Sequence, residues 1–300
     1  MPMILAVDSS TSYTAPVPQL LKEELASNVN ASQRTEVRAS SSHVYSVAEG
    51  ANMEGFTETQ DGLVVKVSGT LVYDTFPYLG YGFSTYLGIR RAVMNAVDKA
   101  KEKNTKIILY LDSPGGEVRS LFELVYALRS HIEASGVKLQ VVAGALCCSA
   151  AYALAMIAND GVYQDPDLQL SSLIGSIGVY MITIDAREAY EKAGVKIMVF
   201  RSGVHKGSGS PLVGLTEEEQ RAVQQRIDDS AGRFFKVVSQ GRGISIEDIK
   251  SMEGDSFSYE KAKELNLVNG IYLEEEGTMP ISPEPQAQQP TSPAQAQVAP

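Results

Sequence analysis

Cysteine is nearly absent from this 300-residue chain, which contains only Cys147 and Cys148. Neighbouring cysteines rarely pair with each other and no third one exists, so a disulfide framework is excluded. Reduced thiols are typical of a reducing compartment. Apolar residues make up 44% of the chain, which is enough for a packed core.

Histidine and basic residues are scarce as well. The three histidines are His43, His131 and His205, and none belongs to a His-Glu-x-x-His pattern. Paired Cys-x-x-Cys motifs are missing too, so no metal-ligand spacing is found. The formal net charge is −10 and no stripe of Lys and Arg is present. We therefore expect no metal, no cofactor and no nucleic-acid partner.

Charge-free runs long enough to cross a membrane are limited to one borderline case. Residues 141–158 form 18 uncharged positions, at the lower limit for a transmembrane helix. Gly144, Ser149 and several alanines inside the run favour a buried strand, a turn and a buried helix instead. The first residues lack a basic region and their apolar run stops at Asp8, so we expect no signal peptide and no membrane contact.

Composition divides the chain into three parts. Residues 1–60 are rich in Ser, Thr, Asn and Ala and predict a weakly ordered, flexible N-terminal arm. Residues 274–300 are dominated by Pro, Gln, Ala and Ser and predict a disordered tail. Residues 61–273 alternate strand and helix patterns, and this part is expected to be the folded domain.

Repeated strand–helix–strand patterns in the middle part predict an α/β fold with a mostly parallel sheet flanked by helices. Thr216 and Glu219 form a capping box before the longest helical pattern. We expect strands over 63–67, 106–112, 139–143, 177–184 and 196–200, and helices over 84–103, 118–134, 150–158, 186–193 and 216–239.

Two glycines follow a predicted buried strand in the segment Asp112-Ser-Pro-Gly-Gly116. At a helix start, the backbone N–H groups of Gly115 and Gly116 would have no hydrogen-bond acceptor, and no Cβ atom would cover them. They could form an oxyanion hole or another anion cradle. A simple strand-to-helix turn explains the same residues.

A serine stands where the next strand should turn into a helix, in Gly144-Ala-Leu-Cys-Cys-Ser149. The helix dipole at that position favours developing negative charge, so Ser149 is a candidate nucleophile. The alternative role is an ordinary helix N-cap. Cys148 is a rival nucleophile, although buried cysteines are more often inert packing.

A serine nucleophile needs a base, and Lys206 in a glycine-rich loop is one candidate. Lysine can act as a base only if its pKa falls by roughly 3 units, which burial could supply. Lys206 could equally be a solvated loop residue, and His205 is a competing base. No Gly-x-Ser-x-Gly elbow is present, which argues against an α/β-hydrolase triad.

Four motifs, taken in order, resemble the signal peptide peptidase A family of Ser–Lys proteases. They are Asp112-Ser-Pro-Gly-Gly116, Ser149-Ala-Ala-Tyr152, Gly175-Ser-Ile-Gly-Val179 and Gly203-Val-His-Lys206. The Ser-Pro-Gly-Gly turn is shared with Clp proteases. The resemblance extends from about Asp61 to Tyr272 and implies a crotonase/Clp-like fold and a homo-oligomer.

The resemblance also implies roles for individual residues. Ser149 resembles the nucleophile, Lys206 the general base, and Ser176 the hydroxyl that orients the lysine amine. Gly115 and Gly116 resemble the oxyanion-hole turn, with the Ser149 N–H as a second donor.

Residues 81–90 and the spacing through Asn269-Gly270 look closer to phage prohead or capsid assembly (head maturation) proteases. That subfamily implies scaffold and capsid proteins as substrates, cut in the host cytoplasm inside a viral procapsid. Three alternatives remain open: a peptidase of the same family in the bacterial cytoplasm, a non-catalytic assembly scaffold on the same fold, and a crotonase-type acyl-CoA enzyme.

Overall fold

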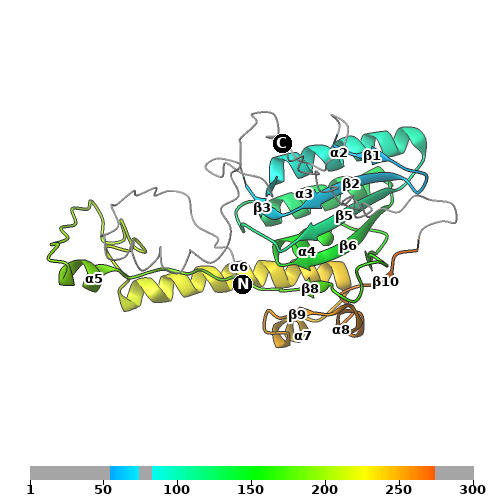
Figure 1. Cartoon of the computed structure of the whole chain (residues 1–300). Helices are drawn as coiled ribbons and strands as arrows, with labels where there is room; N and C mark the ends of the chain where they lie inside the picture. Colours follow the sequence, from blue (N-terminus) through cyan, green and yellow to red (C-terminus); the bar gives the residue numbers. More distant parts are fainter. Residues whose placement is uncertain (1–54, 74–82, 274–300) are drawn as a thin grey trace, which may run out of the picture.

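A computed structural model describes residues 55–73 and 83–273 (Figure 1). The predicted tail over 274–300 and most of the predicted N-terminal arm lie outside these residues. The described helices are α2 (Tyr86–Lys103), α3 (Leu121–Ser135), α4 (Ala150–Ala155), α5 (Arg187–Lys192), α6 (Glu217–Arg242), α7 (Ile246–Ser251) and α8 (Tyr259–Glu264). The described strands are β1 (Thr57–Glu58), β2 (Leu63–Ser68), β3 (Thr70–Val72), β4 (Phe83–Thr85), β5 (Ile107–Ser113), β6 (Leu139–Cys148), β7 (Val162–Gln164), β8 (Leu173–Gly175), β9 (Ser256–Phe257) and β10 (Gly270–Ile271).

The main sheet has the order β1-β2-β5-β6-β7-β10, and the pairs from β2 to β10 are parallel. Strand β6 is ten residues long and has two neighbours on one side. Its first half pairs with β7, and its second half pairs with β8, which is joined antiparallel to β9. The predicted α/β fold with a mostly parallel sheet flanked by helices is confirmed.

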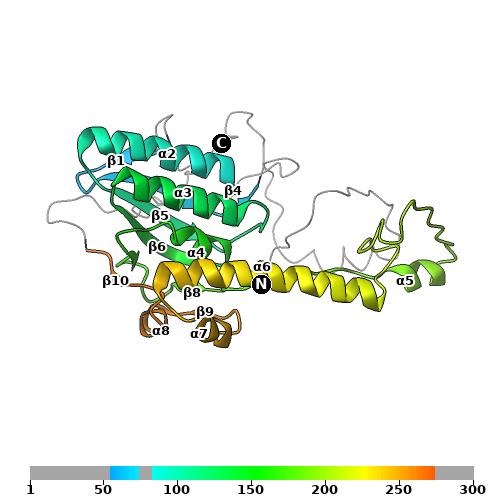
Figure 2. The ribbon, with the colours of Figure 1, turned by 180° about the vertical axis from the view of Figure 1, so that it is seen from behind.

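Helices α2, α3 and α4 cover one face of the sheet (Figure 2). Helix α2 buries Ile89, Val93 and Ala96, spaced by the 3.6-residue period that its sequence predicts. All six residues of α4 are buried, and four of them are alanines, so this helix can lie close to the sheet. Ser149 directly precedes this buried helix and is thereby placed at the edge of the core.

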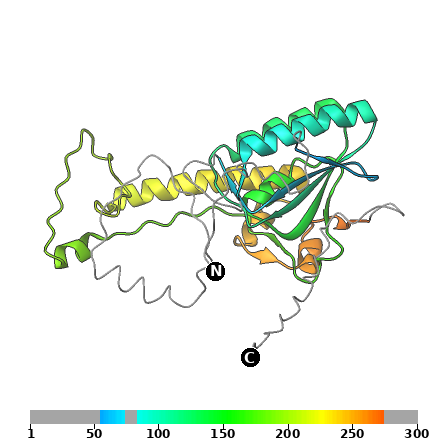
Figure 3. The same ribbon diagram turned by 45° about the horizontal axis from the view of Figure 1, so that its top comes forward.

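Helix α6 is anchored at one end only. Phe234, Val237 and Val238 near its C-terminal end are buried, whereas most of its first half is exposed, with Glu219 as the buried exception. Its first half and α5 project away from the sheet (Figures 1 and 3). The predicted capping box between Thr216 and Glu219 is confirmed. We call residues 178–233 the projection.

Two predicted strands, 177–184 and 196–200, are wrong for this structure. Both segments lie in or at the start of the projection, and neither pairs with another strand within the described residues. Ile184, Met198 and Phe200 are 67%, 69% and 91% exposed. The β-branched and aromatic residues of the two segments favour strands. A strand also needs the edge of another strand to pair with, and composition does not show whether one is present.

Candidate active site

Ser149 occupies a strained turn between β6 and α4. Its φ is 52° and its ψ is −123°, and a positive φ is uncommon for a residue with a Cβ. The Ser149 side chain makes no capping hydrogen bond to α4, which removes the N-cap role that its position suggested. The hydroxyl is therefore held at the helix start by a strained backbone without serving as the cap.

Gly115 lies directly beside this serine, and the next residue, Gly116, packs against β3. Gly115 has φ 106°, and a Cβ built on it would lie 2.7 Å from the Cβ of Ser149. A Cβ on Gly116 would lie 1.8 Å from the carbonyl oxygen of Leu71 in β3. Only glycine fits at either position. The structure thus brings the predicted glycine turn against the predicted nucleophile.

The amide donors of this turn differ in part from the prediction. The Ser149 N–H donates to the Gly175 carbonyl at 2.8 Å, and the Gly115 N–H donates to the Ser113 hydroxyl at 3.1 Å. The expectation that the Ser149 amide is an oxyanion donor is therefore wrong, because the amide extends the pairing between β6 and β8.

Two other amides are available in the same place. The Gly116 and Ala150 N–H groups have no acceptor among the described residues. The Ala150 nitrogen would lie 3.0 Å from a Cβ built on Gly115, so it lies next to the glycine turn. Sequence reasoning missed Ala150, although its place as the first residue of a predicted helix was a usable signal.

Ser176 lies beside Ser149 because of strand register. Cys148 pairs with Gly175, so the two serines each follow a paired residue at the ends of adjacent parallel strands. Ser176 also has a positive φ of 52°, and its N–H donates to the Asp255 carbonyl at 2.7 Å. The structure therefore places two of the three predicted catalytic residues at neighbouring strand ends.

The two cysteines are poor nucleophiles in this structure. Burial raises the pKa of the Cys147 thiol well above its usual range. Burial also raises the pKa of Cys148, whose Sγ lies 3.2 Å from the Leu173 carbonyl oxygen. Since the thiolate is the reactive form, this environment disfavours the rival assignment of Cys148.

Lys206 is not brought to Ser149 within one chain. It lies exposed in the projection, in a loop attached to the first turn of α6. The part of α6 that packs on the domain begins near Phe234, fifteen residues beyond Glu219, which is roughly 22 Å of helix. His205, the competing base, lies in the same loop, 3.7 Å from a Glu219 oxygen.

Within residues 55–73 and 83–273, no group of three or more His, Cys, Asp or Glu side chains gathers as metal ligands would. In the same described ranges, no helix has the length and apolar composition to cross a bilayer.

A strained serine beside a glycine turn, at the carboxyl end of a parallel sheet, is an arrangement suited to acyl transfer. The comparison with protein families agrees. Residues 131–278 match the model of Peptidase family S49. The matched region contains Ser149, Ser176 and Lys206 and begins after the glycine turn.

Individual relatives come from phages and from cellular organisms. Capsid assembly protease C of Escherichia phage lambda is 30% identical over 69% of this chain and 46% of its own length. Head-tail preconnector protein GP5 of Enterobacteria phage P21 is 29% identical over 69% of this chain and 40% of its own length. The Synechocystis protein slr0021 is 34% identical over 63% of this chain and 66% of its own length. The chain thus spans between 40% and 66% of these relatives.

Proposed function

We propose that this protein is a serine endopeptidase with a Ser–Lys dyad, in which Ser149 is the nucleophile and Lys206 the general base. The observation that carries the proposal is the contact between the Gly115–Gly116 turn and the strained Ser149. The family match, which covers both dyad residues, supports it.

In this proposal Lys206 comes from a neighbouring copy of the chain. Lys206 and Ser149 are far apart in one chain, so the site is incomplete without a partner. The projection exposes large apolar side chains, among them Ile182 (52%), Val204 (72%) and Phe200 (91%), which is unusual on a free surface. Burial against a second copy would cover them and desolvate the Lys206 amine, as a lysine base requires. The predicted homo-oligomer thus becomes part of the mechanism.

The reaction then follows ordinary acyl transfer. The neutral Lys206 amine takes the hydroxyl proton as the Ser149 oxygen bonds to the peptide carbonyl carbon. The Gly116 and Ala150 N–H groups donate to the negative oxygen that forms. The lysine passes its proton to the leaving amine, and water then hydrolyses the acyl-enzyme by the same route. Ser176 orients the lysine amine.

For substrates, we propose scaffold and capsid proteins, cut within a procapsid in the host cytoplasm. The similarity to the phage lambda capsid assembly protease supports this choice. A peptidase of the bacterial cytoplasm is the second candidate, favoured by the similarity to the Synechocystis protein.

The first test compares intact masses of the purified full-length wild-type protein, Ser149→Ala and Ser120→Ala over time, each with and without a candidate capsid substrate. Ser120 is the matched control because it also has a positive φ, 58°, and starts a helix without a side-chain cap. Cleavage by the wild type and Ser120→Ala but not by Ser149→Ala is expected. Equal cleavage by Ser149→Ala would exclude Ser149 as the nucleophile.

A further inference from the structure

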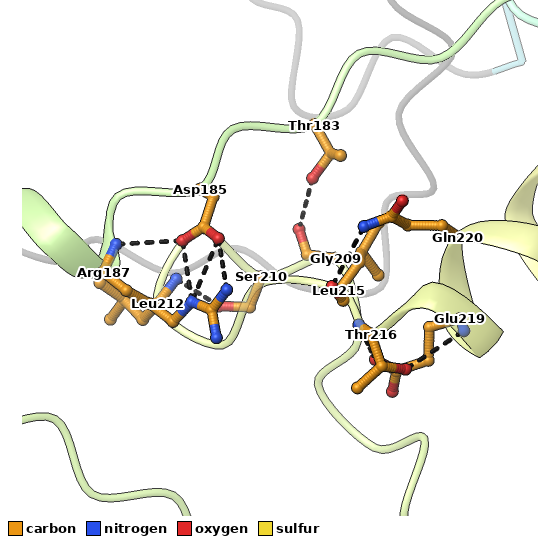
Figure 4. A network of polar contacts seen from close by, with 10 residues as sticks. All are labelled: Thr183, Asp185, Arg187, Gly209, Ser210, Leu212, Leu215, Thr216, Glu219 and Gln220. Carbon is orange, nitrogen blue, oxygen red and sulfur yellow. Dashed lines mark hydrogen bonds and ion pairs between the residues drawn. The ribbon is translucent and has the colours of Figure 1, made fainter.

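Glu219 makes more contacts than a helix cap requires. It is the third residue of α6, and its side chain is 8% exposed. Its Oε2 accepts the Thr216 N–H at 2.9 Å and the Thr216 hydroxyl at 3.1 Å, which completes the capping box (Figure 4). These bonds are local to the helix start and use only one of the two carboxylate oxygens.

The other oxygen reaches the loop that carries Lys206. Glu219 Oε1 accepts a short hydrogen bond from the Ser208 hydroxyl and lies 3.7 Å from Nδ1 of His205. His205 and Ser208 stand on either side of Lys206 in sequence, and the Ser208 N–H donates to the His205 carbonyl at 3.3 Å. One carboxylate oxygen therefore accepts a hydrogen bond from one end of the turn around Lys206 and lies close to the other end.

The same loop is held from its other side by the segment before α5. The Thr183 hydroxyl donates to the Gly209 carbonyl at 3.2 Å, and the Ala186 N–H donates to the Pro211 carbonyl at 2.8 Å. Figure 4 shows the contact between Thr183 and Gly209 and, separately, the capping box between Thr216 and Glu219 at the first turn of α6. Gly203, Gly207 and Gly209 would otherwise leave the loop many conformations, because glycine restricts the backbone least.

We propose that Glu219 is the positioning residue for Lys206: it fixes the lysine loop to the first turn of α6, so that the projection presents the amine in one place. This proposal rests on the proposed function, because it takes Lys206 as the base and gives Glu219 the role of holding the Lys206 loop on α6. A cap alone would need Oε2 only, whereas positioning needs the bond from Oε1 to Ser208. Ser208→Ala removes that bond, together with the contact of the Ser208 hydroxyl to the His205 carbonyl at 2.9 Å, and leaves the capping box intact, so an effect that it shares with Glu219→Ala is assigned to the carboxylate and not to the cap.

The first measurement needs no peptidase activity. Full-length chains that all carry Ser149→Ala are digested with trypsin under native conditions, at a dilution where they sediment as single copies so that no neighbouring copy covers Lys206. The rate of the cut after Lys206 is followed by mass spectrometry. Glu219→Ala and Ser208→Ala are expected to speed this cut about tenfold, because cleavage follows local opening. Glu218→Gln removes a charge from the same turn, on a side chain that is exposed, and is expected to leave the rate unchanged. If both loop variants behave like Glu218→Gln, Glu219 does not hold the loop.

The second measurement uses the same substitutions in the active protein. Glu219→Ala and Ser208→Ala are expected to lower kcat about tenfold with KM little changed, since a misplaced base weakens the chemical step. Glu219→Gln, whose amide oxygen still accepts a hydrogen bond, should recover part of kcat. A looser loop with unchanged kcat would overturn the positioning role. If the wild type shows no Ser149-dependent cleavage, the proposed function fails and the positioning role with it, while the trypsin rates still decide whether Glu219 holds the loop.

Discussion

Gly115 lies directly against Ser149: a Cβ on the glycine would be 2.7 Å from the serine Cβ and 2.9 Å from the Cys148 carbonyl oxygen. The space around the proposed nucleophile is therefore left open because the residue that faces it, Gly115, has no side chain. The two residues follow β5 and β6 and meet because those strands are parallel neighbours.

Replacing this glycine should damage both activity and folding. Gly115→Ala combines the clash with Ser149 and a φ of 106°, so we expect a loss of activity of about 100-fold or more. The stability loss should be about 2 kcal/mol or more, measured by urea unfolding. Gly136→Ala is the control, because its φ is 72° but nothing lies within 4 Å of the added Cβ. Similar effects of both substitutions would mean that the backbone angle, rather than contact with Ser149, matters.

The strained backbone at Ser149 predicts that a residue better suited to these backbone angles would stabilise the fold although activity is lost. Glycine tolerates φ 52° and ψ −123° better than serine or alanine does. Ser149→Gly should therefore be inactive yet more stable than Ser149→Ala, by about 1 kcal/mol. Thermal unfolding of the two inactive variants measures the difference. A glycine variant that is the less stable of the two would contradict the strained geometry.

If the base comes from a neighbouring copy, two inactive variants should restore each other. Ser149→Ala keeps Lys206, and Lys206→Ala keeps Ser149, so mixed assemblies contain some complete sites. Mixing the two after dissociation and reassembly should recover up to about a quarter of wild-type activity when pairing between copies is random. Ser149→Ala mixed with a double variant of both residues is the control and should stay inactive. No recovery in the first mixture would place both dyad residues in one chain.

The exposed apolar residues of the projection should be needed for assembly. Phe200→Asp is expected to shift the protein to smaller species in sedimentation velocity, because it places a charge in the surface that a second copy would bury. Leu170→Asp is the matched control, since Leu170 is 93% exposed, close to the 91% of Phe200, but lies outside the projection. Dissociation by both variants would point to a general loss of fold.

Acid should loosen the start of α6. Hydrogen bonds to the Glu219 carboxylate lower its pKa from 4.5 to about 2. The bond from the Ser208 hydroxyl contributes most, and the bond from the Thr216 N–H contributes next. A lowered carboxyl pKa stabilises the folded state above the unfolded value, and that contribution is lost as the pH falls from about 4.5 towards 2. Hydrogen exchange over residues 203–219 should therefore lose protection in this window, apart from the ordinary change in the intrinsic rate. Glu219→Gln should show no such loss, and an equal loss in that variant would assign the effect to other groups.

Much of the domain could be predicted from local patterns. The apolar period of α2 and α3, the buried strands β5 and β6 and the capping box of α6 are properties of short segments, and all are confirmed. The glycine turn could be recognised from the sequence because an anion cradle of backbone N–H groups needs residues without side chains, and two adjacent glycines are visible in the sequence. Both motifs were expected directly after predicted strands, and the structure shows that these strands are parallel neighbours, which brings the turn against Ser149.

The remaining features depend on pairing across the chain. The Ser149 amide was assigned wrongly because its partner, the Gly175 carbonyl, belongs to a three-residue strand that no periodicity reveals. Segments 177–184 and 196–200 have strand composition, but composition carries no information about which edge they would join. The distance between Ser149 and Lys206 depends on the direction in which α6 leaves the domain, which residue order does not determine.

The direction of α6 also affects how many sites an assembly can complete. If each copy offers its lysine to one neighbour, a row of copies in one orientation always has an end whose serine receives no base. Only closure into a ring, or a mutual exchange between two copies, matches the number of working sites to the number of chains. A chain with a defective lysine would then inactivate the site of the neighbouring chain and not its own. In a mixed population, the loss of activity would therefore depend on how wild-type and defective chains are arranged around the assembly.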